Sequence, residues 1–159
     1  MNKILRFLIC ATLLSVGVLI HILCMGKDAE QLSFVPPEFD ASAQVGMPVI
    51  PEVLSGGTAE LGNYKMTLTG VIPLKSKDAY IYFANHANND VWMKVRLLDS
   101  NGTVIGESGL LKPNEYVEKI RLKQVPKESE IVVKVMCYEP DTYHSKGSAQ
   151  LPLPTIEIQ

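Results

Sequence analysis

The stretch Val91-Trp-Met-Lys-Val-Arg-Leu-Leu98 decides the fold of this chain. Its apolar residues stand at every second position, and between them lie Trp92, Lys94 and Arg96. Successive side chains of a β-strand point to opposite faces, so a period of two indicates a strand with one buried face. We therefore expect an amphipathic strand here, with its aromatic and cationic side chains turned away from a core.

A turn follows this strand directly, at Asp99-Ser-Asn-Gly102. Asn-Gly is the strongest short-range hairpin signal, because both residues tolerate the positive φ of a primed turn. The stretch Thr103-Val-Ile-Gly106 is then the antiparallel partner. The sequence thus predicts a β-hairpin over residues 91–106.

Further strand-like stretches lie on both sides of the hairpin, separated by Pro, Gly and Asn. They are residues 64–69, 79–83, 116–122, 131–137 and 148–151. About seven short strands at spacings near ten residues, without a helical segment, are typical of an all-β immunoglobulin-like β-sandwich. The Cys and Trp signature of antibody domains is absent, so the likeness is architectural only. We place the β-sandwich domain at residues 64–159.

The N-terminus has a different character. Lys3 and Arg6 lead into an apolar run that ends at Met25 and contains no acid, Lys, Arg or Pro. Counted from Ile4, this run is long enough to cross a bilayer core of roughly 30 Å as a helix. We expect one N-terminal transmembrane helix at residues 4–25, within a membrane anchor at 1–26. The leading cations predict a cytoplasmic N-terminus and an extracytoplasmic C-terminal domain.

A cleaved signal peptide is the alternative for the same residues. Its apolar stretch usually has about 7–15 residues and is followed by small residues at the cleavage site. Here the apolar run is longer, and only Cys24 and Gly26 have the required spacing. The sequence favours the uncleaved anchor and leaves cleavage open.

Residues 27–63 are rich in proline and show no lasting period, which predicts a tether between membrane and domain. Phe34, Val35 and Phe39 are unusual in a solvated tether. They either dock on the domain or lie on the membrane surface, and both possibilities remain open. At the other end of the chain, Ile156-Glu-Ile158 is suited to add to a sheet edge, its own or that of a neighbour.

Charge and cysteine content exclude several functional classes. The chain has a formal net charge of −2, and the part beyond the cationic anchor is more acidic still, without a Lys/Arg cluster that would neutralise nucleic-acid phosphates. Cys10 and Cys24 lie in the predicted span, so Cys137 has no disulfide partner in the exported part. No Cys/His set has metal-ligand spacing, and we expect neither a metal nor another cofactor.

No catalytic residue is predicted. The stretch Gly106-Glu-Ser-Gly-Leu110 lacks the last glycine of a nucleophile elbow and precedes no helix. His86 and His144 lie in loop-like segments near Asn and Ser, which is a common arrangement in chains of this size. We expect the protein not to be an enzyme.

A binding site is predicted from the side chains that alternate with the core positions. If Ile81 and Phe83 point inward, their neighbours point outward, and the same argument applies to the other strands. The predicted binding residues are Tyr80, Tyr82, Trp92, Lys94, Arg96 and Tyr138. Exposed aromatic side chains in one patch mark a binding surface for a sugar or a peptide. The alternative is that these rings are packed, since aromatic residues are frequent in strands.

Three stretches carry a resemblance to a known family: Tyr80-Ile-Tyr-Phe-Ala-Asn85, residues 91–102, and Ile105-Gly-Glu-Ser-Gly-Leu-Leu-Lys-Pro-Asn-Glu-Tyr116. Their order resembles the core of small, signal-anchored, single-domain immunoglobulin-like envelope proteins of Gram-positive anaerobes. The family has no assigned catalytic residues, so the resemblance implies a fold and no reaction.

Together these features predict a non-enzymatic, membrane-anchored extracytoplasmic binding or adhesion module at the cell envelope. Its expected partners are the membrane, through residues 4–25, and an envelope protein or polysaccharide, but no nucleic acid. The alternative is a structural accessory subunit of a membrane or surface assembly, in which the span itself makes the contact.

Overall fold

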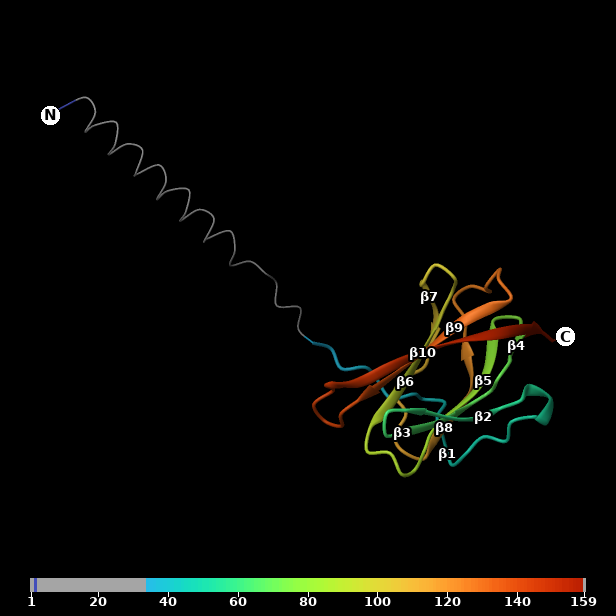
Figure 1. Ribbon diagram of the computed structural model, residues 1–159, viewed down its shortest axis with the longest axis horizontal. Coiled ribbons are helices and arrows are strands. Elements are labelled where there is room, and N and C mark those ends of the chain that lie inside the picture. The colour runs from blue at the N-terminus through green and yellow to red at the C-terminus, as the bar shows by residue number, and fades with distance from the viewer. Residues whose placement is uncertain (1, 3–33, 159) are drawn as a thin grey trace. The chain divides into compact units, whose positions relative to one another are not determined.

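The computed structural model describes residue 2 and residues 34–158 (Figure 1). The chain divides into two compact units, Met1–Val35 and Pro36–Gln159, and the fold below is that of the second. Within the described residues, no helix is both long enough and apolar enough to cross a membrane. The anchor predicted at residues 4–25 lies outside the described part of the chain.

The strands of the second unit confirm the all-β class expected from the sequence. Its strands are β1 Gln44–Val45, β2 Gly57–Leu61, β3 Tyr64–Leu68, β4 Ile72–Lys75, β5 Asp78–Asn85, β6 Trp92–Leu98, β7 Val104–Glu107, β8 Glu115–Arg121, β9 Glu130–Tyr138 and β10 Ser145–Glu157. A short 3-10 turn, η1 Glu52–Leu54, precedes β2. The hairpin predicted over residues 91–106 is formed by β6 and β7.

The strands form one curled sheet in the order β1-β8-β5-β4-β10-β9-β6-β7, with β3 also paired to β5 and β2 to β3. It folds over into two layers, as expected for a β-sandwich. The β5 layer contains β1, β8, β5, β4, β3 and β2, and the β6 layer contains β9, β6 and β7. The long strand β10 joins them: residues 145–154 pair antiparallel with β9, and residues 155–157 pair parallel with β4 (Figure 1).

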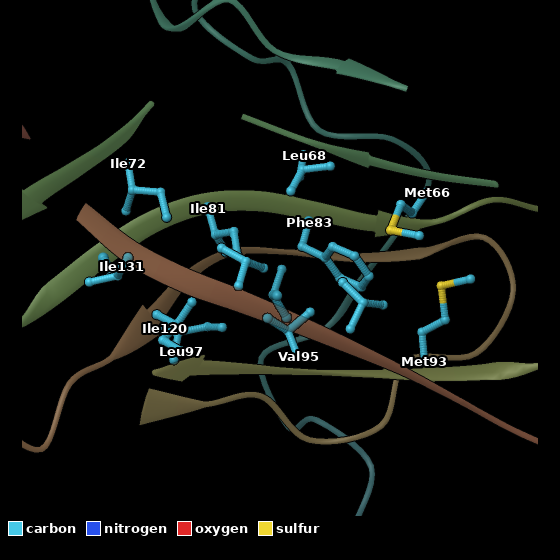
Figure 2. Close-up of a cluster of buried hydrophobic side chains, with 14 of the residues drawn as sticks. Met66, Leu68, Ile72, Ile81, Phe83, Met93, Val95, Leu97, Ile120 and Ile131 are labelled. Atoms are coloured by element: carbon cyan, nitrogen blue, oxygen red, sulfur yellow. The ribbon is translucent and has the colours of Figure 1, made fainter. Parts of the chain in front are cut away.

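The hydrophobic core lies between the layers. Figure 2 shows Ile81 and Phe83 of β5 pointing towards Val95 and Leu97 of β6. These four side chains are fully buried, at 0% exposure. The alternation in the sequence therefore identifies the inward face of both strands, because each buried residue is followed by a half-buried one along most of their length.

Pro152 and Pro154 lie within β10, whereas the sequence predicted a strand ending near residue 151. The Thr155 N–H donates to the Ser129 carbonyl (2.7 Å) on the β9 side, and the Ile158 N–H donates to the Leu74 carbonyl (2.9 Å) on the β4 side. Because N–H groups alternate along a strand, the nitrogens of both prolines face away from β9. No described strand pairs with that edge over residues 145–154, so the prolines remove no ladder hydrogen bond.

The folded unit begins before residue 64. Strand β1 pairs with β8, β2 pairs with β3, and Leu54 is buried at 5% exposure. The boundary drawn from the sequence, with a tether at 27–63, therefore does not coincide with the unit that begins at Pro36. Prolines conceal the β pattern here, and β1 is only 2 residues long, too short to produce a period.

The turn between β6 and β7 differs from the primed turn expected at Asn101-Gly102. Gly102 has a φ of 79°, but Asn101 is not in the positive-φ region. The Asp99 carbonyl accepts the Gly102 N–H at 2.9 Å, and the Asp99 side chain accepts the N–H groups of Asn101 and Thr103 at 2.9 and 2.8 Å. This is a longer turn that ends in a left-handed glycine next to a bulge, and the Asp99 carboxylate stabilises it.

Candidate functional site

The six predicted binding residues lie on two layers and do not form one face. Tyr80 and Tyr82 belong to β5, whereas Trp92, Lys94 and Arg96 belong to β6 and Tyr138 to β9. All six are half-buried, as expected for residues that alternate with a core. The core separates the two groups, so they belong to two different surfaces.

Trp92 is packed against the N-terminal segment of the folded unit. Its ring meets the ring of Phe39 edge to face, with centroids 4.8 Å apart, and that of Tyr143 at 5.3 Å. Trp92 also lies directly opposite Tyr138 in the ladder between β6 and β9. The Lys112 ammonium is 4.7 Å from the Phe39 ring centroid. Phe39 therefore docks on the domain, which was one of the two possibilities left open for it.

Backbone hydrogen bonds hold Phe39 in this place. The Asp40 N–H donates to the Leu110 carbonyl (2.9 Å), and the Leu110 N–H donates to the Glu38 carbonyl (2.8 Å). The Asp40 carboxylate accepts the Gly109 N–H at 2.7 Å. A Cβ atom at Gly109 would overlap the backbone of Asp40, so this approach requires glycine. We call residues 38–40 and 109–110 the N-terminal clasp.

Lys94 and Arg96 share one carboxylate on the outer side of the β6 layer. Lys94 Nζ is 3.1 Å and Arg96 Nε is 3.0 Å from Glu107 Oε2. Partial burial of Glu107 raises its pKa, but the hydrogen bonds from both cations outweigh this effect and lower the pKa below its usual value. Glu107 therefore stays ionised and fixes both cationic side chains.

Tyr80 and Tyr82 line a hollow on the outer side of the β5 layer, which we call the tyrosine groove. Its volume is about 530 Å³, and it is open to solvent. The lining residues are Pro51, Val53, Leu54, Pro73, Lys75, Tyr80, Tyr82, Ile156 and Ile158. Val53, Ile156 and Ile158 remain exposed at 83%, 43% and 41%. The groove has the size of a ligand site and a mostly apolar surface.

A bulge in β5 places Tyr82 in the groove. Tyr80 pairs with Lys119 and Phe83 with Val117, so Ile81 and Tyr82 together face the single residue Glu118. Tyr82 takes up the extra residue with a φ of 47°, a left-handed conformation that costs a non-glycine residue about 1–2 kcal/mol. The bulge keeps both Ile81 and Phe83 in the core while Tyr82 turns outward. Strained residues of this kind are concentrated at functional sites.

The electrostatic setting of the two tyrosine side chains differs. Desolvation raises the pKa of Tyr82, and the charge of Glu118 adds to this effect. The Lys119 ammonium lies 5.8 Å from the Tyr80 ring centroid. The two rings are 6.3 Å apart and tilted by 34°. They form a broad aromatic wall, in which the raised pKa keeps the Tyr82 hydroxyl neutral at physiological pH.

The apolar part of the groove was not predicted. The sequence indicated that Ile156-Glu-Ile158 adds to a sheet edge, and the structure shows that this edge belongs to its own β4. Residue 156 lies at the end of β10 and residue 158 just after it, and both side chains border the groove. Pro51 and Val53 come from the segment expected to be a tether, and the sequence pattern carries no signal that brings them to Tyr80.

Two of the residues considered for catalysis, His86 and Ser108, make hydrogen bonds within the fold. Thr67 Oγ1 is 2.8 Å from His86 Nε2, and the Ser108 hydroxyl donates to the Gly109 carbonyl at 2.8 Å. Burial raises the pKa of the Cys137 thiol to about 11. Within residues 34–158, no group of three His, Cys, Asp or Glu side chains is arranged to hold a metal ion.

No family model, curated protein or solved structure matches this chain. The resemblance to small envelope proteins of Gram-positive anaerobes therefore stays a prediction.

Proposed function

We propose that the protein is a non-enzymatic binding module and that its tyrosine groove receives an apolar segment of a partner protein. The observation that carries this proposal is an open hollow of about 530 Å³ bordered by the exposed side chains of Val53, Ile156 and Ile158. Exposed apolar side chains gathered around one hollow mark an interaction site, because covering them removes apolar surface from water.

The chemistry of the lining favours a peptide over a polysaccharide. Among the described lining residues, the polar side-chain groups are the hydroxyls of Tyr80 and Tyr82 and the ammonium of Lys75. A buried sugar would leave many of its hydroxyl groups without partners, which costs free energy for each. An extended peptide with aliphatic side chains fills the groove, and an acidic group near its end pairs with Lys75.

The setting of this module is proposed from the sequence. An immunoglobulin-like β-sandwich on an N-terminal membrane span, with the cytoplasm on the N-terminal side, presents the groove outside the membrane at the cell envelope. In the alternative, an accessory subunit of a membrane assembly, the span at residues 4–25 makes the decisive contact. A binding module should still bind its partner when residues 4–25 are replaced by an unrelated span. An accessory subunit should not.

The test is capture of envelope proteins by the full-length protein, purified in detergent and immobilised. Val53→Asp and Ile156→Asp should each reduce capture of the specific partner at least tenfold, because a charge enters the apolar groove. Val49→Asp is the matched control: Val49 is 90% exposed and does not line the groove. Undiminished capture by both groove variants would disprove the proposal. Loss of capture only after exchange of residues 4–25 would establish the accessory subunit instead.

A further inference from the structure

A second surface lies on the outer face of the β6 layer. The strand register aligns its outward-facing side chains into rows that run across the strands. The first row contains Glu107, Arg96, Lys134 and Gln150, contributed by β7, β6, β9 and β10. The next rows contain Lys94, Met136 and Ser148, followed by Trp92 and Tyr138. We call Lys94, Arg96 and Lys134, together with Ser148 and Gln150, the cationic strip.

The cationic strip carries more positive charge than the neighbouring Glu107 carboxylate neutralises. Glu107 pairs with Lys94 at 3.1 Å and with Arg96 at 3.0 Å. Lys134 lies directly opposite Arg96 and takes part in no ion pair of the described residues. Lys94, Arg96 and Lys134 beside the single carboxylate of Glu107 leave a local formal charge of +2, in a chain whose net charge is −2.

This arrangement is unfavourable for the domain alone. Like charges directly opposite each other on neighbouring strands repel, and here Arg96 faces Lys134. The side chain of Lys94 is only 12% exposed, so its charge acts in a partly desolvated setting where interactions are stronger. An anion between the strands would relieve the repulsion.

We propose that the cationic strip binds a linear acidic polysaccharide. Residues two apart on a strand are separated by about 7 Å, which suits a chain that carries one acidic group per sugar ring or two. Ser148 and Gln150 are exposed and supply hydrogen bonds for neutral hydroxyl groups. Tyr138 lies half-buried beside the strip, opposite Trp92, where the accessible part of its ring can contact a sugar. This site is separate from the tyrosine groove and requires no occupant there.

Binding at this site can be followed by tryptophan fluorescence, because Trp92 is the single tryptophan of the chain and borders the strip. We would titrate the full-length protein in neutral detergent with polygalacturonate and follow Trp92 emission. The expected result is a saturable change whose apparent affinity falls as salt is added. Neutral dextran should produce no change.

The decisive variant is Arg96→Gln with Lys134→Gln, which should weaken binding of polygalacturonate at least tenfold. The matched control is Lys65→Gln with Lys77→Gln, which removes the same charge from exposed positions of the β5 layer, on β3 and between β4 and β5. It should bind within about twofold of the wild type. Near-UV circular dichroism and the urea midpoint of each variant establish that it is folded.

Three results would overturn the inference. Equal weakening in both double variants would show a response to net charge alone. Unchanged binding by the Arg96 and Lys134 variant would remove the strip from the interaction. Binding of poly-glutamate as tight as that of polygalacturonate would assign the strip to acidic polypeptides. Val53→Asp, which disables the groove, should leave polygalacturonate binding unchanged, so the two proposals fail independently.

Discussion

Single residues determine how the N-terminal segment and the groove are built. At the N-terminal clasp, Gly109 permits the backbone of Asp40 to approach, and Phe39 then covers Trp92. In the groove, Tyr82 accepts a strained φ of 47° so that its neighbours stay buried. Both features depend on one residue type at one position, which makes them suitable for substitution.

Gly109→Ala should loosen the N-terminal clasp. The new Cβ atom overlaps Asp40, and such overpacking typically costs about 1–3 kcal/mol in the free energy of unfolding. Urea denaturation followed by Trp92 emission measures the loss, and native emission should shift to the red as Phe39 moves away. Gly57→Ala is the control, because no atom lies within 4 Å of its added Cβ. Equal stability of the two variants would contradict the role of the clasp.

Tyr82→Phe tests the environment of the groove. Desolvation raises the pKa of Tyr82, so its hydroxyl should be among the last tyrosine groups to ionise in a spectrophotometric titration. The variant should lose the part of the absorbance change that occurs at highest pH. The control is Tyr116→Phe, whose hydroxyl donates to the exposed Gln44 side chain at 2.9 Å. If both variants lose the same part of the curve, Tyr82 is not desolvated.

At the scale of secondary-structure elements, strand β10 determines where the sheet has an open edge. Strand β10 belongs to both layers, and its residues 145–154 leave one edge unpaired among the described strands. Unpaired edges invite association with other chains, and proline is a recognised means of blocking them. Pro152 and Pro154 occupy alternate positions that are both exposed, which places them where they obstruct this edge.

Replacing both prolines, Pro152→Ala with Pro154→Ala, should therefore promote self-association. Two N–H groups then become available at the open edge, while the pairing with β9 is retained. Analytical ultracentrifugation of the detergent-purified protein should show larger species, which increase with concentration. Pro48→Ala, outside the strands, serves as the control. A sedimentation profile equal to that of the wild type would show that the prolines do not protect the edge.

The stability of the whole molecule depends in part on carboxyl groups whose pKa values are lower in the folded than in the unfolded state. A hydrogen bond from Lys119 lowers the pKa of Asp78, and one from Lys146 lowers that of Glu139. The pKa of Glu107 is also lowered, by Lys94 and Arg96, despite its partial burial. A carboxyl group with a lower pKa in the folded state binds fewer protons than in the unfolded chain. Its stabilising effect is present at neutral pH and is lost as the pH falls below about 4.

We therefore expect the urea midpoint to fall between pH 7 and pH 3, and to fall less steeply in Glu107→Gln. In that variant, the side chain at position 107 no longer titrates and forms no charge-assisted hydrogen bond with Lys94 or Arg96. Glu118→Gln, an exposed residue outside these ion pairs, should follow the wild-type profile. Identical profiles for the two variants would contradict the assignment.

The sequence by itself determined the all-β class, the inward and outward faces of β5, β6 and β9, and the hairpin of β6 with β7. It did so because burial on one face of a strand leaves a period of two in adjacent residues. Each of the six predicted binding residues is half-buried, as this alternation indicates. Local pattern, however, says nothing of which strands become neighbours.

Only the tertiary structure decided which outward side chains meet. It separated Tyr80 and Tyr82 from Trp92 and placed them beside Ile156, more than 70 positions away in the chain. It also opposed Arg96 to Lys134 and let Pro152 remain in a strand. These outcomes depend on strand order and register, which are set by the packing of the whole core. The groove and the cationic strip are therefore properties of the fold, formed from residues whose local sequence reveals only that they face outward.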